Sequence, residues 1–368
     1  MITMPKPRQH ILPRDPKKQT RKNCLAAVKE DGTDLYYVVN QTHEICLEAA
    51  KQNGMALAYV KEQIPEICIA AIKQDCMALE FVNEQTSEIC MTAVKLDSMA
   101  LQFVKNQTPE LCLEAVRNCG EALKYVKIQT REICIAAMKN DGEALQYVKK
   151  QTGEICLAAV NQRGSAIQYV IDETEEICLA AVKKDGPDFQ FTEYLMHGIT
   201  ISTDHGCALE YIRNQTEKIC LAAVKQYCRC FPYVKKQTDK ICLAAVKQDG
   251  LLLKYVRNQT PEICLAAVQE NGVALSYVKS QTPEICLAAV KRSGIQLVFV
   301  EKQTPEICIA ALQENSTAFA FIKNPTSQMR KEYKPSPPIN ENLSQSEPDN
   351  DFSSGSRRNR KNYPIIEV

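Results

Sequence analysis

Cysteine is the residue of this sequence with the greatest capacity for chemistry, because it occurs 18 times and many of its positions are regularly spaced. Thirteen cysteines follow one another at steps of 22 residues, with a single longer step of 42. Two copies of the surrounding segment, QTPEICLAAV at 259–268 and at 281–290, are identical. Regularly placed thiols could form disulfides, bind metal ions or react with oxidants, so their places in the fold decide whether they carry function.

A second group of cysteines lies outside this series, near the middle of the chain. His205 and Cys207 occupy the same part of one repeat as Cys228 and Cys230 occupy in the next. One His and three Cys are a typical ligand set for zinc. Their H-x-C and C-x-C spacings are short, and drift in a degenerate repeat explains them equally well. A zinc-dependent or redox centre at these four residues is therefore kept as a third hypothesis.

Motifs for catalysis are not found in the sequence. The four histidines do not recur in the repeat, and none stands in a metalloprotease or nucleophile-elbow context. The sequence also has no glycine-rich phosphate-binding loop that ends in Lys followed by Ser or Thr. We expect a protein that is not an enzyme and that needs no cofactor.

The charge balance and the hydropathy of the chain restrict the partners and the location that we expect for the protein. Lys and Arg (45) balance Asp and Glu (44), which leaves no overall attraction to nucleic acid or to an anionic membrane. No segment has the length and apolar character of a signal peptide or a membrane span. For a chain of 368 residues with these features we expect reduced cysteines, an intracellular location and no membrane partner.

The elements that position these residues follow from an internal repeat of 22 residues. Its consensus is Q-T-P-E-I-C-L-A-A-V-K-Q-D-G-x-A-L-x-Y-V-K-N, and its positions are numbered 1 to 22 from the Gln. Fourteen units cover residues 19–324, and the ninth, at 195–214, has 20 residues of which only the second half fits. The units begin at residues 19, 41, 63, 85, 107, 129, 151, 173, 195, 215, 237, 259, 281 and 303.

Each unit is predicted to form a helix, a turn and a second helix. Thr at position 2 can cap a helix, Pro at position 3 suits its first turn, and Glu at position 4 favours the positive end of its dipole. Gly at position 14 is expected to end this helix in the left-handed conformation, before a shorter helix at positions 15 to 21. Helices below about 12–15 residues are marginal alone and need neighbours. The predicted fold class is all-α: an α-solenoid of about fourteen 22-residue helix-turn-helix repeats.

The repeated Cys at position 6 lies at the centre of the apolar arc of the first helix. Position 9 is Ala in all thirteen units that keep this helix, which indicates the closest contact between helices. Successive Cys residues should be about 8–10 Å apart, too far for a disulfide or a shared zinc ion. We expect buried, structural thiols. We likewise expect the aromatic residue at position 19 to close the core rather than to stack on bases.

Function is then expected where units expose a surface or depart from the consensus. Position 15, directly after the Gly, is apolar near both ends of the repeat array and largely polar between them. Such apolar rows can dock helices or loops of a partner protein, or can pack on the solenoid itself. The residues concerned are Met55, Met77 and Met99 near the start, and Leu251, Val273 and Ile295 near the end.

Two rows of Lys and Arg, at positions 11 and 21, offer an alternative surface for a phosphate backbone. Glu at position 4 falls at nearly the same angle of the helical wheel as position 11, so we expect a face of mixed sign. The nucleic-acid hypothesis names Lys51, Lys73, Lys95, Arg117, Lys139, Lys225 and Lys247 at position 11. At position 21 it adds Lys61, Lys105, Lys127, Lys149, Arg213, Lys235, Arg257 and Lys279.

The segments on either side of the repeats differ from them in composition. Residues 1–18 are rich in Pro, Lys and Arg and predict a disordered basic arm. Residues 325–368 are rich in Ser, Asn, Pro and charge and predict a disordered tail. We therefore divide the chain into this arm, a repeat domain at 19–324 and the tail.

The run KICLAAVKQDGLLLKYVRNQT at residues 240–260 resembles a family of repeats of unknown function found chiefly in giant DNA viruses of amoebae and in some amoeba-associated bacteria. The resemblance extends over 19–324, and the 20-residue unit departs from it. It implies a viral helical-repeat protein inside the host cell, in the host cytoplasm first, with the nucleus and the virus particle as further locations. It implies no activity, because the family has no assigned catalytic residues.

These observations together predict a non-enzymatic helical-repeat scaffold. We expect it to bind a macromolecular partner, a protein in the first place, along an extended surface through many weak contacts. Nucleic-acid binding along the Lys/Arg rows is the alternative, by analogy with helical repeats that read one base per unit.

Overall fold

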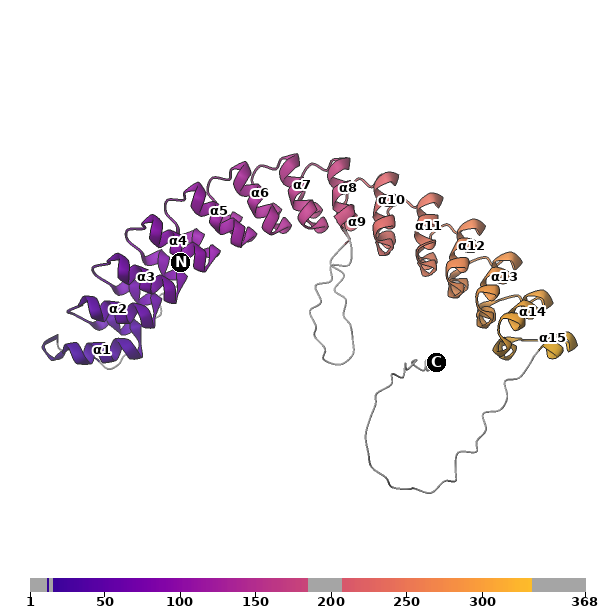
Figure 1. The fold of residues 1–368 in the computed structure, drawn as a ribbon, viewed down its shortest axis with the longest axis horizontal. Coiled ribbons are helices and arrows are strands. Elements are labelled where there is room, and N and C mark those ends of the chain that lie inside the picture. Colours follow the sequence, from indigo (N-terminus) through magenta and orange to yellow (C-terminus); the bar gives the residue numbers. More distant parts are fainter. Residues whose placement is uncertain (1–11, 13–15, 185–206, 333–368) are drawn as a thin grey trace, which may run out of the picture.

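The structure is a computed structural model that describes residues 12, 16–184 and 207–332 of the chain. In these residues every regular element is a helix. Elements that are consecutive in sequence lie next to one another along a curved array, whose two ends are far apart (Figure 1). The predicted all-α solenoid is confirmed.

The first helix is an α-helix that covers positions 3 to 12 in every predicted unit where it is described, except unit eleven, where it ends at position 10. Thr at position 2 caps it as predicted, because its hydroxyl accepts a hydrogen bond from the backbone N–H of position 5. In unit two, Thr42 Oγ1 accepts from Ile45 N at 3.4 Å. These helices are α1 (Arg21–Glu30), α2 (His43–Gln52), α3 (Pro65–Gln74), α4 (Ser87–Leu96), α5 (Pro109–Asn118), α6 (Arg131–Asn140), α7 (Gly153–Gln162), α8 (Glu175–Lys184), α10 (Glu217–Gln226), α11 (Asp239–Val246), α12 (Pro261–Glu270), α13 (Pro283–Arg292) and α14 (Pro305–Glu314).

The second element of most units is a six-residue 3-10 helix at positions 14 to 19, where the sequence predicted a helix at 15 to 21. Asp or Asn at position 13 begins it by accepting from the N–H of position 15, as Asp97 does from Met99 N at 2.8 Å. These helices are η2 (Gly32–Tyr37), η3 (Gly54–Tyr59), η4 (Cys76–Phe81), η5 (Ser98–Phe103), η6 (Gly120–Tyr125), η7 (Gly142–Tyr147), η8 (Gly164–Tyr169), η9 (Cys228–Tyr233), η10 (Gly250–Tyr255), η11 (Gly272–Tyr277), η12 (Gly294–Phe299) and η13 (Ser316–Phe321).

The prediction that Gly at position 14 ends the α-helix in the left-handed conformation is wrong. The α-helix ends on an extended residue, as at Asp31 with φ −141° and ψ 110°, and no left-handed glycine is needed. A Cβ on Gly32 would instead lie 2.4 Å from the backbone oxygen of Ala49 in the next unit. Gly at this position therefore fits the close approach of neighbouring units, and four described units have a larger residue there: Cys76, Ser98, Cys228 and Ser316.

The α-helices of successive units pack side by side in one row, and the 3-10 helices form a second row against them. Buried side chains at positions 5, 6, 9 and 10 of the α-helix meet those at 16, 17 and 20 of the second element. In unit three these include Ile67, Ala71 and Leu79. Position 9 is fully buried Ala in each of these α-helices, which supports its predicted place at the closest contact.

Gln at position 1 joins the units through a network that the sequence alone did not suggest. Gln63 Nε2 donates to Phe81 O at 2.8 Å in its own unit and to Leu57 O at 3.3 Å in the preceding unit. Its Oε1 accepts from Asn83 N at 2.9 Å. Buried polar groups are thereby satisfied between the rows, and positions 19 to 22 are fixed at the same edge of the solenoid as the start of the α-helix.

The irregular centre is one composite unit rather than a separate short unit at 195–214. Arg213 N donates to Glu173 Oε2 at 3.1 Å, across 40 residues, where position 21 reaches position 1 across 20 residues in other units. Helix α10 packs directly beside α8. Residues 173–184 and 207–214 therefore form this unit, and residues 185–206 lie between its halves, outside the described part of the chain. We call residues 19–172 of the solenoid its N-terminal arm, which does not include the basic segment at 1–18, and residues 215–324 its C-terminal arm.

Both ends of the repeat domain extend further than the sequence predicted. Helix α15 (Ser327–Glu332) starts another unit, in which Thr326 Oγ1 accepts from Met329 N at 3.3 Å and Met329 is buried. At the other end, η1 (Pro16–Lys18) precedes the first unit and Leu12 packs against the core. The rest of the segments predicted to be disordered lies outside the described residues.

The helices are short throughout. Among the described residues, none has the length and hydropathy that a membrane-crossing helix requires.

Candidate functional site

The thirteen cysteines at position 6 are buried and carry free thiols, as predicted. In nine units the sulfur lies within hydrogen-bonding distance of the Gln at position 1, such as Cys156 Sγ to Gln151 Oε1 at 3.5 Å. Burial raises the pKa of these thiols above their ordinary value, and that of Cys178 to about 11. The thiols are therefore protonated at neutral pH and act as small core residues.

Position 15 has different surroundings in the two arms. In the N-terminal arm, Met55, Met77 and Met99 are half-buried. In the C-terminal arm, Leu251 is half-buried, whereas 38% of Val273 and 42% of Ile295 are exposed. The second group of predicted docking residues is thus the one that offers apolar surface.

The aromatic residue at position 19 packs against the core from unit two to the composite unit, as Tyr59 and Phe81 do, but no described ring at this position is fully buried and the prediction fails from unit ten onward. Its ring is half-buried from unit one to the composite unit and exposed from unit ten onward. Sequence reasoning missed this difference, since Tyr and Phe occur in both arms. Tyr147 contacts Glu121 at position 15 of the preceding unit, so the repeat places Phe299 beside Val273 and Phe321 beside Ile295.

These exposed side chains form one surface, which we call the C-terminal apolar stripe. The helices η11, η12 and η13 pack against one another in order and contain no charged residue. Val298 at position 18 adds a side chain that is 51% exposed. The stripe consists of Val273, Tyr277, Ile295, Val298, Phe299 and Phe321.

Lys and Arg at position 21 have a structural role that the sequence did not show. Lys105 Nζ donates to Val82 O at 3.0 Å and to Asn83 O at 3.2 Å, both in the preceding unit. The side chains of all eight residues predicted at this position donate to backbone oxygens of the preceding unit in this way. Their charge is engaged in holding units together.

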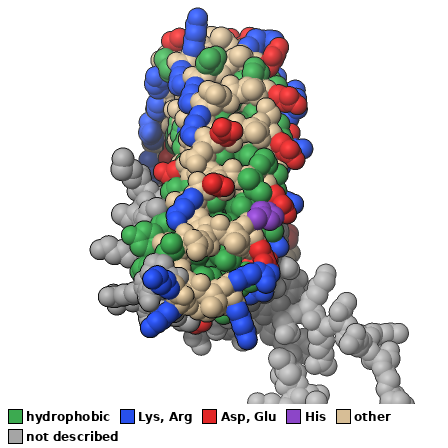
Figure 2. Space-filling model, turned by 90° about the vertical axis from the view of Figure 1, so that its left-hand side faces the viewer, with side chains coloured by type: hydrophobic (Ala, Val, Ile, Leu, Met, Phe, Trp, Pro, Cys, Tyr) green, Lys and Arg blue, Asp and Glu red, His purple; other side chains and the backbone are tan. Residues whose placement is uncertain are grey.

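The predicted residues at position 11 are exposed, from Lys51 to Lys247. Position 4 lies at the other end of the same α-helix, about 10 Å away at 1.5 Å per residue. Because the helices stand side by side, the two signs form two parallel rows on the face for which the sequence predicts mixed sign. Figure 2, seen from the N-terminal end, shows a column of Lys and Arg along one edge and Asp and Glu interspersed with Lys and Arg along the other.

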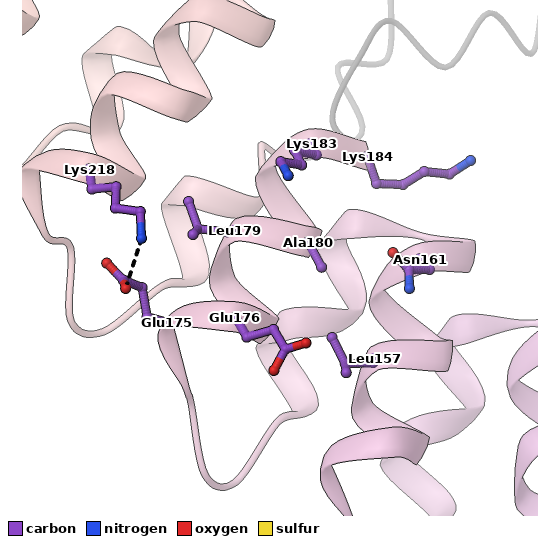
Figure 3. A pocket seen from close by; sticks show the side chains of 9 residues that line it. All are labelled: Leu157, Asn161, Glu175, Glu176, Leu179, Ala180, Lys183, Lys184 and Lys218. Atoms are coloured by element: carbon purple, nitrogen blue, oxygen red, sulfur yellow. Dashed lines mark hydrogen bonds and ion pairs between the residues drawn. The ribbon is translucent and has the colours of Figure 1, made fainter.

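Shallow grooves run between neighbouring α-helices. One of about 600 Å³ lies between α7, α8 and α10, with Leu157 and Leu179 as apolar lining (Figure 3). Lys218 Nζ and Glu175 Oε2 form an ion pair of 3.1 Å beside it. A second groove of about 700 Å³ lies between α5, α6 and α7, two units away, and uses the same unit positions. The groove is thus a feature of the repeat and not a unique pocket.

Two of the four predicted zinc ligands are bonded to each other in the described structure. Cys207 and Cys230 form a disulfide with a Cα–Cα distance of 5.8 Å, so neither offers a thiolate to a metal. Cys228 remains a free, half-buried thiol, and His205 lies outside the described residues. No described group of three or more His, Cys, Asp or Glu side chains is arranged to hold a metal. The expectation that every thiol is reduced is wrong for this pair.

Stacked helix pairs with one continuous core define the protein as an α-solenoid. Five overlapping segments, each about two units long, match the family model described as a domain of unknown function (DUF4116). They are residues 42–87, 65–108, 86–129, 108–152 and 130–174, so the repeat in this part of the chain is similar to that of an uncharacterised family. No curated protein and no solved structure matches the chain.

Proposed function

We propose that the protein is a non-catalytic scaffold that binds an extended, apolar segment of a partner protein along its 3-10 row. The observation that carries this proposal is the C-terminal apolar stripe, in which six apolar side chains are exposed on three uncharged neighbouring helices. Clustered exposed apolar surface is typical of interaction sites.

The size and chemistry of the stripe indicate the kind of partner. Helices packed about 8–10 Å apart give three helices a span of roughly 20 Å between the first and the third. An extended peptide of about six residues covers this distance at ~3.3 Å per residue. Because the stripe has no charge, the segment that fits it is apolar and uncharged.

Binding of nucleic acid remains the alternative proposal and now depends on position 11 alone. The Lys and Arg side chains of position 21 donate to backbone oxygens. The acidic row at position 4 runs about 10 Å from the basic row and opposes a polyanion on that face. These charges favour a protein partner.

The place of action is part of the same proposal. The resemblance to repeats of giant DNA viruses of amoebae supports a role inside a host cell, first in its cytoplasm, in a viral context. The partner is then a host or viral protein.

Affinity capture with matched variants tests the proposal. The stripe variant carries Val273→Ser, Ile295→Ser and Val298→Gln, residues that unit seven already has at these positions in Ser165 and Gln168. The control is Ile128→Asn, which removes an apolar side chain that is 78% exposed outside the stripe. Proteins captured by the wild type and the control, resistant to nuclease, should be lost with the stripe variant.

The decisive measurement is the Kd of the purified partner for the three proteins. We expect the stripe variant to weaken binding by about tenfold or more, or ~1.4 kcal/mol. Equal binding to all three, or capture that nuclease and moderate salt abolish, would reject the proposal in favour of the position-11 row.

A further inference from the structure

The junction between the composite unit and unit ten is built differently from the rest of the 3-10 row. The composite unit contributes α9 (Ala208–Tyr211), which has four residues, where neighbouring units contribute six-residue 3-10 helices. In the next unit, Tyr227 stands at the position where Asp or Asn begins the helix in most units, and Cys228 replaces the usual Gly. Local stabilisation by the consensus residues is therefore reduced here.

A covalent bond is found at this same junction. Cys207 is at position 15 of the composite unit and Cys230 is at position 16 of unit ten, and their sulfurs are bonded. Since the units repeat, the same two positions face each other at every junction. The chain has Cys at both of them only here, and position 16 is buried Ala in most other units, such as Ala78.

We infer that Cys207 and Cys230 form a redox-reactive site that exchanges with small disulfides of the glutathione type and that locks the junction between the two arms when oxidised. This inference goes beyond the proposed binding function and does not depend on it. It assigns chemistry to two residues that the zinc hypothesis had named for another purpose.

The reaction balances as two thiol–disulfide exchanges. The Cys207 thiolate attacks a sulfur of glutathione disulfide, which breaks the S–S bond and releases one glutathione thiolate that takes up a proton. Cys230, deprotonated in turn, then attacks the Cys207 sulfur of the mixed disulfide and releases the second glutathione. Two electrons pass from the protein to glutathione disulfide, and reduced glutathione reverses both steps.

Exposure supports this order of attack. Cys207 is 9% exposed and Cys230 is fully buried, so a small disulfide reaches Cys207 first. The position-6 thiols are also buried, and burial keeps their pKa above its ordinary value, as for nearby Cys220. Thiols of this kind react slowly, so the position-6 series does not compete with the junction for the small disulfide.

The repeat itself supplies matched variants for the test. Cys207→Ser introduces the residue that unit seven has at position 15, and Cys230→Ala introduces the usual residue of position 16. Cys228→Ser introduces the residue of Ser98 at position 14 and serves as the control that keeps the disulfide pair.

The experiment uses the full chain equilibrated with reduced and oxidised glutathione at several ratios. Acid quenching, alkylation and peptide mass spectrometry measure the cross-link, and hydrogen exchange measures the opening of α9 and η9. Oxidation should join Cys207 to Cys230 in the wild type and in Cys228→Ser. It should slow amide exchange in α9 and η9 by about tenfold or more.

The two variants that remove one partner should show no redox-dependent change in exchange. Absence of the cross-link at excess glutathione disulfide would overturn the inference. So would a cross-link that leaves the exchange rates of α9 and η9 unchanged in the wild type. Cross-linking of Cys228 in place of Cys230 would equally reject the assigned pair.

Discussion

The two arms of the solenoid share one consensus but treat the same aromatic position differently. In the N-terminal arm the rings have partners in the preceding unit: Tyr59 lies 5.3 Å from the ring of Tyr36, and the Tyr147 hydroxyl donates to Glu121 Oε1 at 3.5 Å. In the C-terminal arm, position 15 is aliphatic in Val273 and Ile295, and the rings at position 19 are exposed. These aliphatic side chains and exposed rings together make up the apolar stripe.

The two arms also differ at the starts of their α-helices, where the last three units of the C-terminal arm follow the consensus more closely. Units twelve to fourteen all begin with Thr and Pro, the residues that cap a helix and suit its first position. The N-terminal arm has Ile64 in place of the capping Thr and Gly153 in place of Pro. Units twelve to fourteen therefore carry stronger local signals for the start of the α-helix than units three and seven do.

The largest expected effect is a loss of stability at alkaline pH, shared by both arms. The folded pKa of each position-6 thiol is raised, so the folded protein keeps the proton where the unfolded chain loses it. This stability is complete below about pH 9 and is lost as the pH rises toward the folded value, about 11 for Cys178. In this window each thiol lowers the free energy of unfolding by up to ~1.4 kcal/mol per pH unit. Urea unfolding between pH 7 and 10.5 should show a steep decline.

Two triple variants show whether both arms take part in this decline. One replaces Cys46, Cys90 and Cys134 by Ala in the N-terminal arm, and the other replaces Cys220, Cys264 and Cys308 in the C-terminal arm. Each should flatten the dependence of the unfolding free energy on pH by a similar amount. A slope that neither variant changes would mean that groups other than the thiols control alkaline unfolding.

The next effect concerns the spacing of units at position 14. A Cβ added to Gly54 would lie 2.5 Å from the backbone oxygen of Ala71. For a Cβ added to Gly272 the nearest atom is Cγ of the Gln296 side chain, at 3.0 Å. Gly54→Ala should therefore cost about 2–3 kcal/mol, because backbone must move. Gly272→Ala should cost less than ~1 kcal/mol, since a side chain can yield and the unfolded chain loses entropy. Urea midpoints of the two variants measure the difference, and equal losses would refute this account.

Much of the fold could be predicted because the repeat shows each requirement many times over. The Thr cap, the buried Cys at position 6 and the Ala at position 9 follow from local sequence and from the apolar arc of one helix. Contacts between units could not be read in this way. The engagement of Lys105 with the preceding unit and the closeness of Gly32 to Ala49 depend on how far apart two helices stand.

The candidate sites were predictable only in part for the same reason. Position 15 was singled out from its composition, but the exposure of Val273 depends on the packing of its neighbours. The composite unit escaped the repeat alignment, which assigned the 42-residue step between Cys178 and Cys220 to a degenerate unit. The link between Glu173 and Arg213 shows that the extra residues interrupt a unit instead.

The smallest expected effect sharpens the contrast between helix starts. Ile64 precedes α3 and makes no side-chain capping bond. Its side chain is 40% exposed, so burial of apolar surface does little to offset the missing bond. Ile64→Thr places a hydroxyl where it can accept from Ile67 N and should stabilise the fold by about 1 kcal/mol. Thr86→Ile in the next unit is the reverse control and should cost a similar amount, because Thr86 Oγ1 accepts from Ile89 N at 3.3 Å. If Thr86→Ile destabilises and Ile64→Thr gives no gain, then packing of Ile64 offsets its missing cap, and the N-terminal arm is not weaker at its helix starts.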